Sequence, residues 1–191
     1  MSAGQPRRTA RSRDPEGRRR ALTAAVVEVI AEVGIGRTTH RAVAARAGVP
    51  LGATTYYFPT LADLVAAGLA RAGAELDAEL CRWADHLGDG TDLAARLTRL
   101  LCGHLADPGR ALTEFELYLA AARSPELRPL ARSWRDQVRR LLTPMVGDRA
   151  AGAVAAFVDG VAVQSLATGE PVDPMAVESA IAALVSAGTV R

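Results

Sequence analysis

The chain has 191 residues, of which 49% are hydrophobic and 23% charged, with a formal net charge of +2 and two cysteines. This length accommodates one medium core, or a small domain joined to a larger one. The cysteines lack a second Cys or His at ligand spacing, which argues against a disulfide or a metal site, so Cys81 and Cys102 are predicted to be small core residues. No uninterrupted apolar stretch approaches the roughly 20 residues of a membrane span, so we expect a cytoplasmic protein that does not use a membrane.

Charge is distributed unevenly along the chain. Residues 1–58 contain ten arginines and four acidic residues, a net charge of +6, whereas residues 59–191 contain thirteen arginines and seventeen acidic residues, a net charge of −4. A basic end on an acidic body is typical of a protein that presents one end to phosphate. The alternative interpretation is an ordinary solvated run of charges.

Residues 1–16 are rich in Gly, Pro, Ser and Arg and show no apolar periodicity, which predicts a disordered basic arm. Basic arms of this kind can enter the minor groove of DNA. An inert solvated tail has the same composition, so both interpretations stay open.

Residues 22–58 have the pattern of a helix followed by a helix-turn-helix. Apolar residues recur at helical spacing over 22–33, and Thr39 is a typical N-cap for a short helix over 39–47. Gly48 supplies the positive φ that ends this helix in a tight turn, and Pro50 stands where the next helix begins.

The second helix of this unit, at about 51–58, carries side chains suited to DNA. Thr54 and Phe58 lie four residues apart and should face inward, which leaves Ala53, Thr55, Tyr56 and Tyr57 pointing outward or sideways. Two adjacent tyrosines on a short, exposed, uncharged helix are unusual for a purely structural surface. In a major groove they would contact bases and phosphates.

The rest of the chain is predicted to be helical. Gly and Pro punctuation indicates helices at about 60–87, 91–106, 108–123, 125–146, 148–168 and 174–187. The fold class is therefore all-α, with an N-terminal three-helix DNA-binding domain at 17–59 and a helical bundle at 60–191. The segments 150–167 and 175–185 are too apolar to face water, so they form either a buried core or a four-helix dimer interface.

Several polar or aromatic residues interrupt these apolar helices. Ligand pockets combine apolar walls with a few polar groups, so these residues are candidates for binding a small, largely apolar effector. A lone His or Trp on a helix is more often an ordinary core residue than a ligand contact, so this alternative stays open for each of them. The candidates are Trp83, His86, His104, Phe115, Tyr118, Trp134 and Gln164.

Two other classes of function were weighed. An enzyme is disfavoured because the chain contains no nucleophile elbow, P-loop, zinc-protease motif or complete dinucleotide-binding turn, and we expect no cofactor and no metal. A helical adaptor protein would explain the apolar helices but not the exposed tyrosine pair.

The segment 17–69 resembles the DNA-binding domain of the tetracycline-repressor (TetR) family. The resemblance rests on the amphipathic helix 22–33, Gly34 and Gly36, Thr38-Thr39, the helix-turn-helix, and Tyr56-Tyr57-Phe58-Pro59. It implies a repressor that binds a DNA operator as a homodimer, pairs through its last two long helices, and releases DNA when a small molecule enters the bundle.

The chain also departs from the family pattern. Leu51 and Leu61 stand where many members have a phosphate-binding lysine, and Ala53 stands where a base-reading threonine is common. Base contacts should then depend on His40, Thr55 and Tyr56, with the remaining contacts made to phosphate. The full set of predicted DNA-binding residues is Thr39, His40, Arg41, Pro50, Thr55, Tyr56 and Tyr57.

Overall fold

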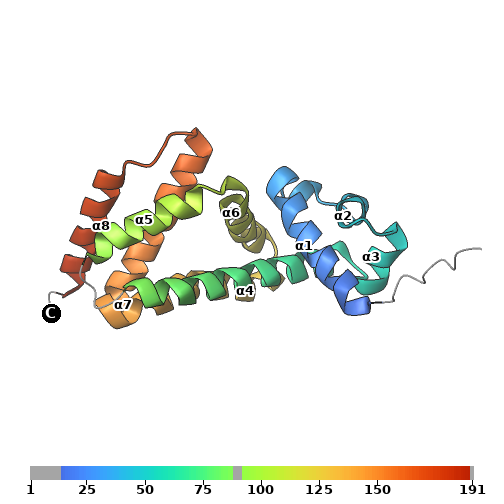
Figure 1. The fold of residues 1–191 in the computed structure, drawn as a ribbon, viewed down its shortest axis with the longest axis horizontal. Coiled ribbons are helices and arrows are strands. Elements are labelled where there is room, and N and C mark those ends of the chain that lie inside the picture. Colours follow the sequence, from blue (N-terminus) through green and yellow to red (C-terminus); the bar gives the residue numbers. More distant parts are fainter. Residues whose placement is uncertain (1–13, 88–91, 190–191) are drawn as a thin grey trace, which may run out of the picture.

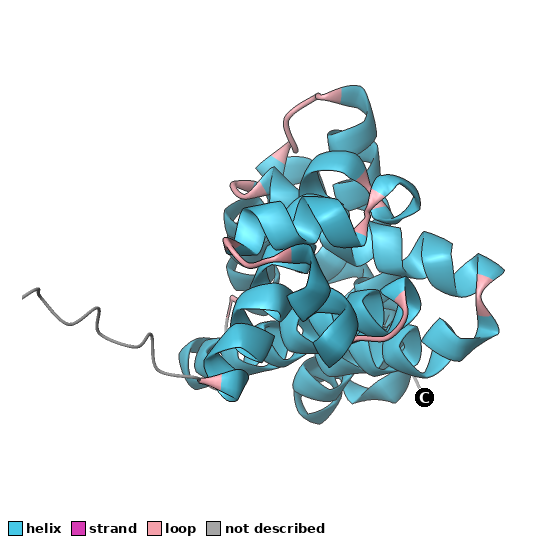
Figure 2. Cartoon of the chain, turned by 90° about the vertical axis from the view of Figure 1, so that its right-hand side faces the viewer, coloured by secondary structure: helices cyan, strands magenta, loops and turns pink. Residues whose placement is uncertain are grey.

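The computed structural model describes residues 14–87 and 92–189, and every regular element in these ranges is a helix (Figure 2). The predicted all-α fold class is confirmed. In chain order the elements are α1 (Pro15–Val33), η1 (Ile35–Arg37), α2 (His40–Ala47), α3 (Leu51–Tyr57), α4 (Leu61–Leu87), α5 (Leu93–Leu105), α6 (Pro108–Arg123), η2 (Pro125–Leu127), α7 (Arg128–Thr168) and α8 (Pro174–Thr189).

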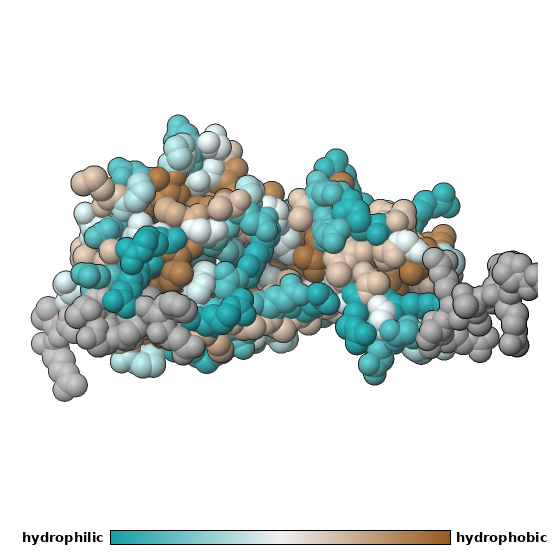
Figure 3. All heavy atoms as spheres, viewed as in Figure 1, coloured by the Kyte–Doolittle hydropathy of each residue, from teal (hydrophilic) through white to brown (hydrophobic). Residues whose placement is uncertain are grey.

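The helices form two parts. Figure 1 shows a small head made by α1 to α3 and a larger body that contains α5, α7 and α8, with α4 running below the body as far as the head and α6 between head and body. In the space-filling view of Figure 3 the outline narrows between head and body, where α4 crosses from one to the other. Hereafter the head means residues 14–59 and the body means residues 92–189.

The head begins earlier than the sequence indicated. The Asp14 carboxylate accepts a hydrogen bond of 2.8 Å from Gly17 N, and Pro15 occupies the first turn of α1. An N-cap followed by proline is a strong helix start, so residues 14–16 belong to α1 and not to the predicted disordered arm. Residues 1–13 of that arm lie outside the described residues.

The helix-turn-helix forms as predicted. Gly48 has φ +64°, and the amides of Gly48 and Val49 donate to the carbonyls of Ala45 and Ala44, which closes the end of α2 in a Schellman motif. Pro50 lies one residue before α3, at its N-cap. These local hydrogen bonds fix the turn that joins α2 to α3.

Helix α4 links the two parts and packs closely on each. Its start is a capping box, in which Thr60 and Asp63 exchange hydrogen bonds between side chain and backbone. A Cβ on Gly68 would lie 2.2 Å from Val26 Cγ1 of α1, and a Cβ on Gly73 would lie 2.2 Å from Trp134 Nε1 of α7. These two glycines allow α1 and α7 to approach the axis of α4.

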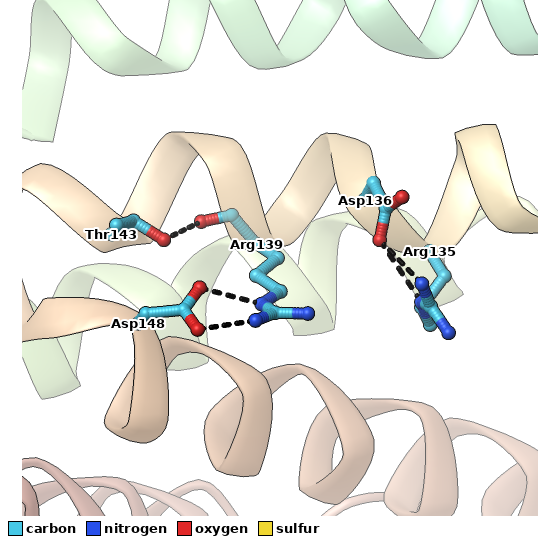
Figure 4. Close-up of polar contacts among 5 residues, drawn as sticks. All are labelled: Arg135, Asp136, Arg139, Thr143 and Asp148. Atoms are coloured by element: carbon cyan, nitrogen blue, oxygen red, sulfur yellow. Dashed lines mark hydrogen bonds and ion pairs between the residues drawn. The ribbon is translucent and has the colours of Figure 1, made fainter.

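Helix α7 is two helices joined by a sharp change of direction at Gly147, as the sequence predicted. Gly147 has φ +76° and ψ +160°, which is not helical. Figure 4 shows how the join is held: the Arg139 guanidinium forms a bidentate ion pair with the Asp148 carboxylate, with Nε 2.8 Å from Oδ1. Thr143 Oγ1 donates to the carbonyl of Arg139 in the preceding turn.

One helix has the length and composition of a membrane span, and the burial predicted for the cysteines needs correction. The segment 125–168 is long and apolar enough to cross a membrane by length and composition, although its halves change direction at Gly147 and the second half packs against α8. A core helix of a bundle passes the same test, and we assign the segment 125–168 to the bundle.

The two cysteines are not the small core residues that the sequence predicted. Cys81 is exposed on the outer side of α4, because it lies away from the face that carries Leu76 and Leu80, and Cys102 is only half-buried.

Candidate DNA-binding surface and effector cavity

Helix α3 presents one face to the core and another to solvent. Thr54 is fully buried and Phe58, at the end of the helix, is 2% exposed, whereas Tyr56 is 79% exposed. Thr55 is also exposed, with its hydroxyl donating to the carbonyl of Gly52. The predicted orientation of α3 is therefore correct, and Tyr56 and Thr55 are free to reach a ligand.

Tyr57 has a mixed environment. Its ring packs against the head core and meets the ring of Tyr56 edge to face, with 5.1 Å between the centroids. The half-buried ring of Tyr57 thus supports the exposed ring of Tyr56.

The predicted DNA-binding residues of α2 gather at its N-terminus. Thr39 Oγ1 accepts a hydrogen bond of 3.1 Å from Ala42 N and caps the helix. His40 is half-buried, and its Nδ1 has no partner among the described residues. Arg41 is exposed and forms no ion pair with any residue that the structure describes, which leaves its charge available for phosphate.

The electrostatics of the head favour DNA on one side. No acidic residue occurs between Glu32 and Asp63, so the whole helix-turn-helix lacks negative side chains. Arg46 does not add to this positive surface, because its guanidinium is paired with Glu28 and Glu32 of α1. Pairing of Arg46 with α1 joins α2 to α1 and leaves Arg41 as the exposed cation of α2.

A cavity of about 80 Å³ lies inside the body, bounded by α4, α5, α6 and both halves of α7. Its walls are mostly leucine and valine. Three of the predicted ligand-binding residues line it, namely Trp83 from α4, His104 from α5 and Phe115 from α6.

Two carboxylates that the sequence analysis did not select also line this cavity. They are Glu114 of α6 and Asp159 of α7, and among the residues that the structure describes no arginine lines the cavity with them. Glu114 Oε2 lies 3.5 Å from His104 Nε2. Burial, with the nearby charge of Glu114, raises the pKa of Asp159 to about 7 in spite of the opposing effect of His104.

The other predicted ligand-binding residues lie elsewhere. Tyr118 is beside Phe115, with 6.3 Å between ring centroids, but does not line the cavity, and burial raises the pKa of its hydroxyl. Trp134 is buried against Gly73 of α4, next to a second hollow between head and body. Gln164 is exposed on the outer side of α7, and the side chain of His86 lies outside the described residues.

A sequence signal for Asp159 did exist. In the apolar segment 150–167, Asp159 and Gln164 are the two strongly polar residues, and an isolated carboxylate in such a segment is a functional candidate. Glu114 had no comparable signal, because it lies among other polar residues of α6.

Comparisons with known proteins cover both parts of the chain. Residues 22–67 match the family described as "Bacterial regulatory proteins, tetR family", and residues 88–187 match "Tetracyclin repressor-like, C-terminal domain". No curated protein matches the sequence.

Solved structures agree over most of the chain. A TetR family member from Streptomyces coelicolor A3 is 38% identical with a TM-score of 0.78, over 87% of this chain and 97% of that one. The multidrug binding protein EbrR complexed with ethidium is 39% identical with a TM-score of 0.78, over 87% of this chain and 98% of that one. Further structures hold EbrR with proflavin and with malachite green.

Proposed function

We propose, because this chain belongs to the TetR family of DNA-binding transcriptional regulators, that it is a repressor released from its operator by a lipophilic organic cation. The repressor acts as a homodimer on a palindromic site. The cation fills the cavity in the body and is held by apolar walls and by two carboxylates.

The observation that carries the choice of ligand is the pair Glu114 and Asp159 in an otherwise apolar cavity. A carboxylate removed from water is costly unless a positive charge compensates it. The cavity lining offers only His104 for this purpose, next to Glu114, and Asp159 responds with a pKa raised to about 7. A cationic ligand would supply the missing charge, and the aromatic rings of Trp83 and Phe115 suit a flat apolar cation.

The relatives support the same ligand class. EbrR, at 39% identity, has been crystallised with ethidium, and also with proflavin and malachite green. These are flat or propeller-shaped aromatic compounds that carry positive charge. We extend this chemistry to the present chain on the strength of its own two carboxylates.

The size of the cavity suggests how binding releases DNA. At about 80 Å³ the cavity is smaller than the roughly 300–1,000 Å³ of pockets that hold drug-sized ligands. A dye must therefore move the surrounding helices apart, and two of these, α4 and α6, also contact the head. A ligand that fits only the expanded body binds this state more tightly than it binds the DNA-binding state. The difference between the two affinities shifts the equilibrium away from the DNA-binding state.

The outer side of the last two helices supports dimerisation. Exposed or half-exposed small and apolar residues follow one side of α7, including Ala153, Ala156, Gly160 and Val163. A Cβ on Gly160 would meet no atom within 4 Å, so this side is unfilled in the single chain. Met175 of α8 is 80% exposed, and a second copy of the pair α7 and α8 would cover both surfaces.

The test uses ethidium and an operator selected from random duplexes. We expect the dimer to bind the selected palindrome, ethidium fluorescence measured without DNA to report binding to the protein, and the same dye concentrations to release the DNA from the wild-type protein. Because ethidium also intercalates into duplex DNA, release counts as the protein's response only where the Asp159→Asn protein keeps its DNA at the same dye concentration. Asp159→Asn and Glu114→Gln should weaken dye binding, whereas Glu126→Gln, at an exposed acid of η2, is the matched control and should not.

Two results decide against parts of the proposal. If no palindrome is selected, the chain is not an operator-binding repressor. If ethidium binds the wild-type protein and operator affinity stays unchanged, the protein is a DNA-binding regulator without this small-molecule switch.

A further inference from the structure

Helix α6 is the wall that the cavity shares with the head. Glu114 and Phe115 line the cavity, and the two residues that follow them reach the other way. Glu116 Oε2 accepts a hydrogen bond of 2.9 Å from the backbone N–H of Ile35, the first residue of η1. Leu117 is fully buried in the core that also contains Leu22 of α1.

The hydrogen bond of Glu116 joins α6 to the head. Among the described residues it is the one hydrogen bond that joins the head to the body. Gly34 makes room for it, since a Cβ at that position would lie 3.0 Å from Glu116 Oε1. Gly34 also has φ +76°, so a side chain there would be strained as well as crowded.

The turn that Glu116 holds leads directly into α2. Within the turn, Thr38 Oγ1 donates to the carbonyl of Gly34 at 2.9 Å, and Thr38 N donates to the carbonyl of Ile35 at 3.2 Å. Thr38 is 3% exposed, so these bonds are shielded from water. The turn therefore moves as a unit, and the next residue, Thr39, is the N-cap of α2.

We infer that Glu116 is the positioning residue that couples the cavity to the DNA-binding surface. Its carboxylate fixes the turn 34–38, and thereby the start of α2, at the position that α6 takes beside the cavity in this structure. A ligand that displaces α6 either breaks this hydrogen bond or pulls the turn 34–38 along with α6, and in both cases it moves the helix-turn-helix. The inference rests on the proposed function and adds the contact that transmits the signal.

The experiment compares Glu116→Ala, Glu116→Gln and Leu119→Ala, the last at an exposed residue of the same helix. For each protein the ratio of operator Kd with saturating ethidium to operator Kd without dye is measured. Coupled sites typically differ by about 5- to 150-fold, and the Glu116→Ala ratio should fall to about 2 or less. Glu116→Gln keeps an oxygen that accepts the Ile35 N–H bond, so it should retain the wild-type ratio, as should Leu119→Ala.

Dye binding measured directly by fluorescence separates this inference from the proposed function. If ethidium fails to bind or fails to release DNA from the wild-type protein, the proposed function is wrong. Two results with a responsive wild-type protein would overturn the coupling role of the hydrogen bond. In the first, Glu116→Ala keeps the wild-type ratio of operator Kd with dye to operator Kd without dye. In the second, Glu116→Gln loses this ratio as completely as Glu116→Ala does.

A measurement on the wild-type protein covers the case in which Glu116→Ala does not fold. Ethidium should accelerate amide hydrogen exchange in the segment 34–39, because the Ile35 N–H loses its partner. Unchanged exchange there, under conditions that release DNA, would overturn the inference.

Discussion

Binding of a permanent cation to the cavity should depend on pH through Asp159. Burial in the cavity raises the pKa of this carboxyl to about 7, so it is largely neutral below that pH and ionised above it. A bound cation stabilises the ionised form and lowers the pKa. Below pH 7 binding must then release a proton, and affinity falls as the pH falls.

The size of the effect follows from the ionised fraction of Asp159. With a pKa of about 7, roughly nine-tenths of the carboxyl is ionised at pH 8 and roughly one-tenth at pH 6. When only the ionised form binds well, the measured Kd is the intrinsic Kd divided by this fraction. The Kd for ethidium should therefore rise about tenfold between pH 8 and pH 6, and level off above pH 8.

The assay is a fluorescence titration with ethidium between pH 5.5 and 8.5, because the charge of this dye does not change in that range. Asp159→Asn is the control: it should bind the dye more weakly at pH 8 and lose most of the pH dependence. Glu114 and His104, the other titratable groups of the cavity, remain in this variant, so any slope that they cause will persist. A wild-type Kd that is constant from pH 6 to pH 8, or an equal slope in Asp159→Asn, would refute the reasoning.

Three further predictions concern stability, the DNA surface and the dimer. In unfolding experiments Asp159→Asn should raise stability at pH 8, by on the order of 4 kcal/mol at most, and leave it nearly unchanged at pH 3, because a raised carboxyl pKa destabilises the fold only above its unfolded value. Tyr56→Ala should cost about 1 to 3 kcal/mol of operator affinity in a gel shift, with no loss of thermal stability. Thr54→Ala should lower thermal stability and leave the operator affinity of the folded protein unchanged. Loss of thermal stability in Tyr56→Ala would contradict the exposed position of this ring. Gly160→Arg should give a folded monomer in analytical ultracentrifugation, since a Cβ at this position meets no atom of its own chain within 4 Å, and a persistent dimer would place the interface elsewhere.

Local features of the head were predictable because each depends on residues close in sequence. The N-cap at Thr39, the left-handed Gly48 and the inward pair Thr54 and Phe58 are set within one or two helical turns. The start of α1 was misjudged only because the composition of the arm was weighed above the Asp14 cap.

The cavity was less predictable, because its lining depends on how separate helices pack. Trp83 and Trp134 are both aromatic residues on apolar helices, but Trp83 lines the cavity, whereas Trp134 fills the space left by Gly73. Asp159 and Gln164 are five residues apart, which at 100° per residue places them about 140° apart around α7. One therefore faces the cavity and the other faces solvent, and only the packing of α7 decides which.

In the dimer proposed above, the second half of α7 has a consequence for how the protein responds to the concentration of its ligand. Asp159 faces the cavity, and the next residue, Gly160, lies on the open side that we assign to the dimer. A helix with such neighbours transmits any displacement caused by one ligand straight to the partner subunit, with no intervening element. The two cavities of a dimer would then fill cooperatively rather than independently, with a Hill coefficient different from one. The dependence of transcription on the concentration of the cation would then be set by the subunit interface as much as by the cavity.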